Sequence, residues 1–172
     1  MRNLLNCGVL AAALSLAHAA TLQQLSLDDM IQKSTAIVRG SVQLTGGAVH
    51  GRYIYTHYTV HVVEQWKGAT ATQIDFAVPG GTANGLTQSI PGAPSFTNGQ
   101  EYVLYLWTSR SGLTQVIGLS QGLFVSSNGM VVRPAITDHM IDPHGAEASD
   151  PGMQMTLGDM RNRIVAVLKG RS

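Results

Sequence analysis

The stretch YIYTHYTVHVVEQWKG, residues 53–68, decides the fold class of this chain because apolar and polar side chains alternate along it. The even positions hold Ile54, Tyr58, Val60 and Val62, and the odd positions hold Tyr55, His57, Thr59 and His61. A period of two predicts a long β-strand with one buried face. We expect the even positions to face a core, the odd positions to face outward, and the strand to end at Trp66-Lys67-Gly68.

The same alternation recurs on both sides of this stretch. It predicts strands at 36–44, 73–79, 101–107 and 113–118, and a hairpin of 123–125 with 130–132. Gly46-Gly47 is expected to break the first of these, which should bury one face. The nearly all-apolar segment 101–107 is expected to be a central strand. Asn128-Gly129 is the residue pair that a type I′ hairpin turn favours.

Helical spacing marks the two ends of the chain. Leu22–Lys33 predicts a short helix, for which Ser26 is a good N-cap and which has acidic residues in its first turn. Thr156–Lys169 predicts a second helix, which Gly170 would end. Its apolar positions are Leu157, Met160, Ile164, Val167 and Leu168.

Six or seven short strands joined by tight turns, with two flanking helices, predict a mostly β fold. The specific expectation is an OB-like antiparallel β-barrel with a short N-terminal helix and a C-terminal helix. Two segments do not fit this pattern. Gly80–Gln100 is rich in Gly and Pro, with a short strand expected at 86–90, and Pro134–Met155 is polar and expected to be irregular. Long connections of this kind are either functional or mobile.

Residues 1–19 show the three parts of a cleavable signal peptide. Arg2 supplies the basic start, residues 8–17 the apolar run, and Ala17-His18-Ala19 the cleavage site. The run is too short to span a bilayer, and no second such run follows. We expect a single soluble domain, residues 20–172, that is exported to the periplasm or the extracellular space. An uncleaved anchor and a lipoprotein built on Cys7 are the competing interpretations.

Cleavage after Ala19 removes Cys7, the only cysteine, so the mature chain would contain no disulfide. Losing Arg2 takes Lys+Arg from 11 to 10, against 10 Asp+Glu, and leaves a net charge near zero. Charged residues are 12% of the chain, about half the usual fraction. A neutral domain without a clustered basic excess is not an electrostatic nucleic-acid binder.

Three segments resemble the netrin/TIMP-like branch of the OB-fold, the domain of tissue inhibitors of metalloproteinases and their relatives. The segments are 36–42 after a short helix, 58–68 closing on an aromatic-Lys-Gly, and 98–106 with a Gly-x-x-Tyr-hydrophobic pattern. The chain also resembles uncharacterised exported bacterial proteins that share the aromatic-Lys-Gly and Val-Pro-Gly-Gly features. The likeness covers roughly residues 25–133.

This resemblance implies an OB-like fold and a role in binding another protein. In the inhibitors, a mature N-terminal cysteine held by disulfides chelates the protease zinc. Here the mature chain begins at Ala20 or Thr21 and has no cysteine, so that mechanism does not carry over.

The first functional hypothesis is an exported, non-enzymatic module that recognises a protein partner, either a co-exported protease or an envelope component. Interfaces favour tyrosine, and the outward positions of the second strand offer it together with histidine. The candidate partner-binding residues are Tyr55, His57, His61, Pro79, Gly80 and Gly81. We expect no catalytic residue, no cofactor and no metal in this module.

Two alternatives belong to other classes. Gly118-Leu119-Ser120-Gln121-Gly122 matches the G-x-S-x-G pattern of serine hydrolases, with Asp138 or Asp142 and then His139 or His144 in the right chain order. A hydrolase needs a helix after Ser120, but the sequence there predicts a strand. The same histidines, followed by Met153 and Met155, suggest a periplasmic carrier of a soft metal. His57 and His61 lie about 13 Å apart on a strand, too far to share one metal.

Overall fold

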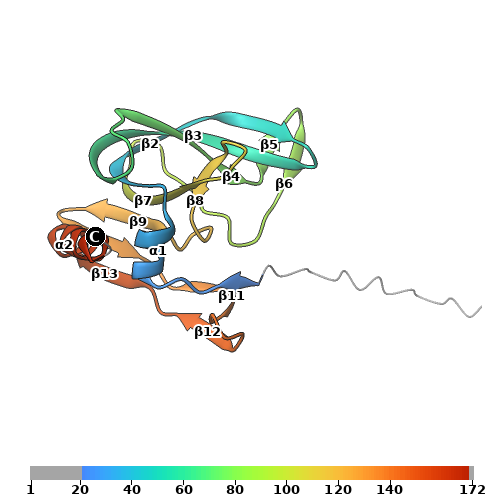
Figure 1. The fold of residues 1–172 in the computed structure, drawn as a ribbon. Helices are drawn as coiled ribbons and strands as arrows, with labels where there is room; N and C mark the ends of the chain where they lie inside the picture. Colours follow the sequence, from blue (N-terminus) through green and yellow to red (C-terminus); the bar gives the residue numbers. More distant parts are fainter. Residues whose placement is uncertain (1–20, 171–172) are drawn as a thin grey trace, which may run out of the picture.

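The computed structural model describes residues 21–170 and confirms a mostly β fold with a helix near each end (Figure 1). The expected signal peptide, residues 1–19 with Cys7, lies outside the described residues. Within residues 21–170, no helix has the length and apolar composition needed to cross a membrane.

The largest sheet contains eight strands. They are β2 (Ala36–His50), β3 (Tyr53–Lys67), β4 (Gln73–Pro79), β7 (Glu101–Thr108), β8 (Thr114–Val116), β9 (Leu123–Ser127), β10 (Met130–Arg133) and β13 (Met153–Thr156). Their order is β13-β10-β9-β7-β2-β3-β4, with β8 also paired to β7. The sequence predicted a barrel, but the sheets of the structure do not close into one. The physical reason is that both edges of β10 are paired, one with β9 and the other with β13. The β9–β10 hairpin therefore extends the sheet away from β4.

Two smaller sheets complete the fold. β1 (Leu22–Gln23), β11 (Ile136–Ile141) and β12 (Glu147–Asp150) form one, and β5 (Gly81–Ala83) with β6 (Leu86–Gln88) forms the other. The prediction that 134–155 is irregular was wrong, because this segment contributes β11, β12 and most of β13. The short strand expected at 86–90 is present as β6.

The two helices begin where side chains cap them. α1 (Leu27–Lys33) has Ser26 as N-cap in a reciprocal capping box with Asp29, and α2 (Leu157–Lys169) has Thr156 as N-cap. The prediction of a helix from Leu22 was wrong at its start, where the chain forms β1. The Lys67 ammonium donates to the carbonyls of Ile31 and Gln32 at the end of α1, which ties this helix to β3.

The β2–β3 hairpin is longer than the sequence predicted. Gly46 (φ 150°) accommodates a bulge, so β2 continues past Gly46-Gly47 to His50 instead of ending there. A Cβ on Gly47 would lie 2.1 Å from the Thr82 carbonyl oxygen, so this glycine lets β5 pack against the hairpin. Gly51 (φ 63°) turns the chain into β3.

Two cores lie on opposite faces of β2 and β7. The first contains Val38, Val42, Tyr58, Val60, Phe76, Val78, Tyr102, Leu104, Leu106 and Val116. The second contains Met30, Ile31, Ile37, Val103, Tyr105, Phe124, Val131, Met160 and Ile164, and both helices cover it (Figure 1). The prediction that segment 101–107 is central is confirmed. The prediction of one buried face for the strand at 36–44 was wrong at Ile37, which is fully buried against the helices.

Phe96 fixes the long segment between β6 and β7. Its ring centroid lies 4.9 Å from that of Tyr58, 5.3 Å from Phe76 and 5.1 Å from Tyr102. The Thr97 amide donates to the Tyr102 hydroxyl at 2.9 Å. This segment is therefore packed against the first core and holds residues 92–95 in place beside β9.

Candidate functional site

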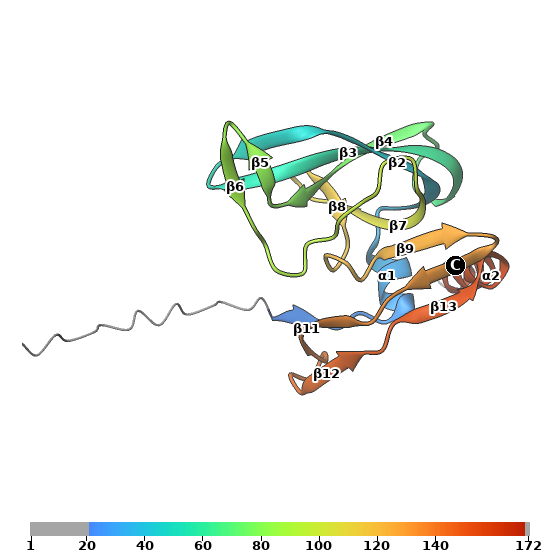
Figure 2. The same cartoon turned by 180° about the vertical axis from the view of Figure 1, so that it is seen from behind.

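Strands β3 and β4 bring together four of the six residues predicted to bind a partner. Tyr55, His57 and His61 occupy alternate positions of β3, and Pro79 of β4 lies directly opposite Tyr55 in the ladder. We call these four residues the outer β3 face. In both views β2 and β3 lie at the top of the molecule, and both helices lie below them (Figures 1 and 2).

Neighbouring polar groups hold this face in place. Gln73 hydrogen-bonds the Nδ1 atom of His61 at 2.9 Å, and the Thr59 hydroxyl donates to the Asp75 carboxylate at 2.5 Å. The His50 ring meets the Tyr55 ring edge to face at 6.4 Å. The outer β3 face is therefore a braced surface of aromatic and imidazole rings.

Gly80 and Gly81, the other two predicted residues, interact with Thr56, whose place in β3 is on the opposite face from Tyr55 and His57. The Thr56 hydroxyl donates to the Gly80 carbonyl at 2.8 Å, and a Cβ on Gly81 would lie 2.0 Å from that hydroxyl oxygen. Both glycines have positive φ, 95° and 114°. Their role in this structure is to turn the chain from β4 into β5.

Ser120 lies in a tight turn between β8 and β9. Leu119 has φ 57°, and the side chain of Gln121 is fully buried, accepting from the Leu25 amide and donating to the Gln23 carbonyl. The chain then enters β9. A nucleophile elbow requires a helix after its serine, so the geometry gives the hydrolase alternative no support.

The acidic and histidine candidates of the alternatives have separate surroundings. Asp142 accepts from the amides of His144 and Ala146 and so closes the β11–β12 turn. Within residues 21–170, neither His139 nor His144 hydrogen-bonds Ser120, and no three His, Cys, Asp or Glu side chains are grouped to hold a metal ion.

Met153 and Met155, the thioethers proposed for a soft metal, pack against the second core. Their half-buried side chains are therefore part of the contact between β13 and the helices.

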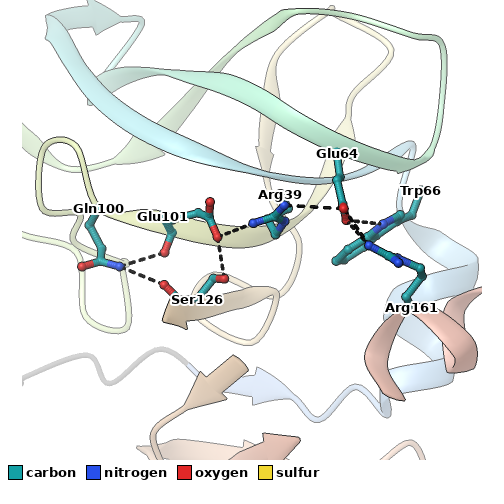
Figure 3. Close-up of polar contacts among 7 residues, drawn as sticks. All are labelled: Arg39, Glu64, Trp66, Gln100, Glu101, Ser126 and Arg161. Carbon is teal, nitrogen blue, oxygen red and sulfur yellow. Dashed lines mark hydrogen bonds and ion pairs between the residues drawn. The ribbon is translucent and has the colours of Figure 1, made fainter. Parts of the chain in front are cut away.

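A row of charges that sequence reasoning missed joins α2 to the sheet (Figure 3). Arg161 of α2 binds both oxygens of Glu64 at 2.6 and 2.7 Å, and Arg39 bridges Glu64 at 3.5 Å and Glu101 at 2.7 Å. Hydrogen bonding from Arg161 is the main cause that holds the pKa of Glu64 below its ordinary value. Burial opposes the charge of Arg39, but Glu101 and Glu64 outweigh it and raise the pKa of Arg39. These ion pairs hold α2, β2, β3 and β7 in place relative to one another.

A second ion pair is almost completely buried. Arg133 donates to both oxygens of Asp150 at 2.8 and 2.6 Å and to the Gln121 carbonyl at 2.8 Å. The side chains of Arg133 and Asp150 are each 4% exposed. This pair joins β10 to β12, and only the fold brings the two residues together.

Between β9 and the segment 92–95 lies a groove of about 370 Å³, which was not predicted from the sequence. Its walls come from four separate parts of the chain: residues 92–95, Tyr102 of β7, residues 120–125 and residues 133–138. Ser120 and Asp138 both line it. No single segment carries a signal for it, because each contributes only a few ordinary side chains.

No family model, curated protein or solved structure matches this chain. The functional assignment therefore depends on the surfaces described above.

Proposed function

We propose that this chain is an exported, non-enzymatic binding module, acting in the periplasm or outside the cell, that recognises a protein partner through the outer β3 face. The observation that carries the proposal is the gathering of Tyr55, His57, His61 and Pro79 on one braced sheet face. Aromatic side chains are enriched where protein surfaces meet, and charged ones are depleted at the centre of such interfaces.

The electrostatic character of this region also supports recognition of a protein. Next to the outer β3 face, Asp75 keeps its negative charge, because the Thr59 hydroxyl that donates to it is neutral. This hydrogen bond orients the carboxylate toward one place on the surface. On this face His61 is exposed, and Tyr55 and His57 are half-buried. A surface that combines such rings with one oriented carboxylate is suited to a partner surface of mixed polarity.

The OB-like, netrin/TIMP-like relationship belongs to the same proposal. In its favour, β2, β3, β4, β7 and β8 surround the first core, and Val78 of β4 and Val116 of β8 both contribute to that core. The strands 136–156 would then be an addition to an OB-like half. A co-exported protease or an envelope component is the partner class that this relationship implies.

The test replaces His57 with a photo-crosslinking amino acid and expresses the protein in its native host. The matched control carries the same group at Val165, which is 41% exposed on α2. We expect one specific protein adduct from position 57 and none from position 165. We expect Tyr55→Ala to reduce this adduct while the variant remains folded, as checked by circular dichroism. Equal adducts from both positions, or an adduct insensitive to Tyr55→Ala, would remove the outer β3 face from consideration.

A further inference from the structure

The groove between β9 and segment 92–95 has mostly apolar walls. Ala93 and Pro94 form one side, Leu123 and Val125 lie along β9, and Ala135 and Ile136 close the other side. The apolar surface continues beyond the groove, since Val132 lies opposite Val125 in the β9–β10 ladder and is 38% exposed. An open depression whose walls are largely apolar, and which continues into exposed apolar surface of the sheet, suits an extended chain segment.

One carboxylate in this groove has no partner. Within residues 21–170, no group hydrogen-bonds or ion-pairs with the side-chain carboxylate of the half-buried Asp138. Gly92, with φ 74°, faces it: a Cβ there would lie 3.1 Å from an Asp138 carboxylate oxygen. The glycine therefore leaves the carboxylate room beside the groove wall.

The other charge at the groove is already neutralised. Arg133 reaches the groove wall, but its guanidinium is held by both oxygens of Asp150. The groove consequently carries one uncompensated negative charge among apolar walls. A cation placed there would gain more than at an open surface, because the surroundings are less polar than water.

We propose that this groove binds an extended peptide segment of a partner protein, with a Lys or Arg side chain paired to Asp138 and apolar residues on either side. The apolar neighbours of the basic residue would pack along Leu123 and Val125. The Ser120 and Ser95 hydroxyls, which also line the groove, are available to the peptide backbone. The groove shares no residue with the outer β3 face, so it is a second surface. A negative result at one surface therefore does not affect the proposal for the other.

The test titrates the mature chain with the end-blocked peptide Ala-Val-Lys-Val-Ala and follows backbone amide resonances by NMR. The comparison peptide replaces Lys with Gln. We expect shifts confined to residues 92–95, Tyr102, residues 120–125 and residues 133–138. We expect the affinity for the Gln peptide to be about fivefold or more weaker, which corresponds to about 1 kcal/mol.

Two variants sharpen the result. Asp138→Asn removes the charge and should weaken the Lys peptide about fivefold while the melting temperature stays the same, because Asp138 has no intramolecular partner to lose. Glu147→Gln is the matched control: it removes an exposed carboxylate from neighbouring β12 and should leave affinity unchanged.

Several results would overturn the proposal. Equal affinity for the Lys and Gln peptides, shifts outside the groove, or no binding at millimolar peptide would each do so. Butylammonium binding as tightly as the peptide would assign the groove to small amines instead. Groove shifts that depend on protein concentration without peptide would assign it to a second copy of this chain.

Discussion

The buried pair of Arg133 and Asp150 gives the sharpest prediction about stability. Asp150→Asn keeps the size of the side chain and the oxygen that accepts from the Gly152 amide at 2.9 Å, but removes the negative charge. The guanidinium would then be left 4% exposed without a counter-ion. Breaking a buried pair in this way costs about 3–5 kcal/mol. That is a large fraction of the roughly 5–15 kcal/mol of a typical domain.

The assay is urea unfolding of the mature chain, and the matched control is Asp28→Asn. Asp28 also binds an arginine through both oxygens, but the side chains of Asp28 and Arg163 are 38% and 55% exposed. Exposed pairs of this kind contribute up to about 1 kcal/mol. We therefore expect Asp150→Asn to cost at least three times as much as Asp28→Asn.

A double variant separates the lost attraction from the stranded charge. Arg133→Met combined with Asp150→Asn removes both charges, and we expect it to be more stable than Asp150→Asn alone, because no unpaired guanidinium remains buried. If Asp150→Asn costs less than about 1 kcal/mol, or if the double variant is no better than the single one, the reasoning from burial is refuted.

Three further predictions concern acid stability, core packing and processing. The pKa of Glu64 is lowered in the fold, so its ionised form stabilises the fold above the ordinary carboxyl pKa, and this stability is lost as pH falls through the folded pKa. Glu64→Gln should therefore make the melting temperature fall less steeply between about pH 5 and about pH 3. An unchanged slope of melting temperature against pH would contradict this. Phe96→Ala should lower the free energy of unfolding by about 3 kcal/mol, because it removes the ring packed against Tyr58, Phe76 and Tyr102; a loss below about 1 kcal/mol would show that segment 89–100 is not held by this ring. N-terminal sequencing of the protein purified from its native host should begin at Ala20 or Thr21, and a sequence beginning at Met1 would rule out cleavage.

Much of the candidate surface was predictable from the sequence because it lies on one strand. The period of two in 53–68 placed Tyr55, His57 and His61 on one face. Pro79 was also predicted, but only the β3–β4 register places it opposite Tyr55. The groove and the buried ion pair were not predictable in this way. Arg133 and Asp150 are 17 residues apart, with β11 and the β11–β12 turn between their strands. The walls of the groove come from four parts of the chain.

The sequence by itself determined the local structure: the alternation of β3, the Ser26 and Thr156 caps, and the Asn128-Gly129 turn, whose φ values are 49° and 75°. These features depend on neighbours within a few residues. Only the tertiary structure decided that β10 pairs with β13, that Ile37 is buried on a second face, and that the sheet stays open. The reason is that alternation specifies which face of a strand is buried, whereas the backbone groups along its edges are the same in nearly every residue. Which edges meet therefore depends on packing between distant segments.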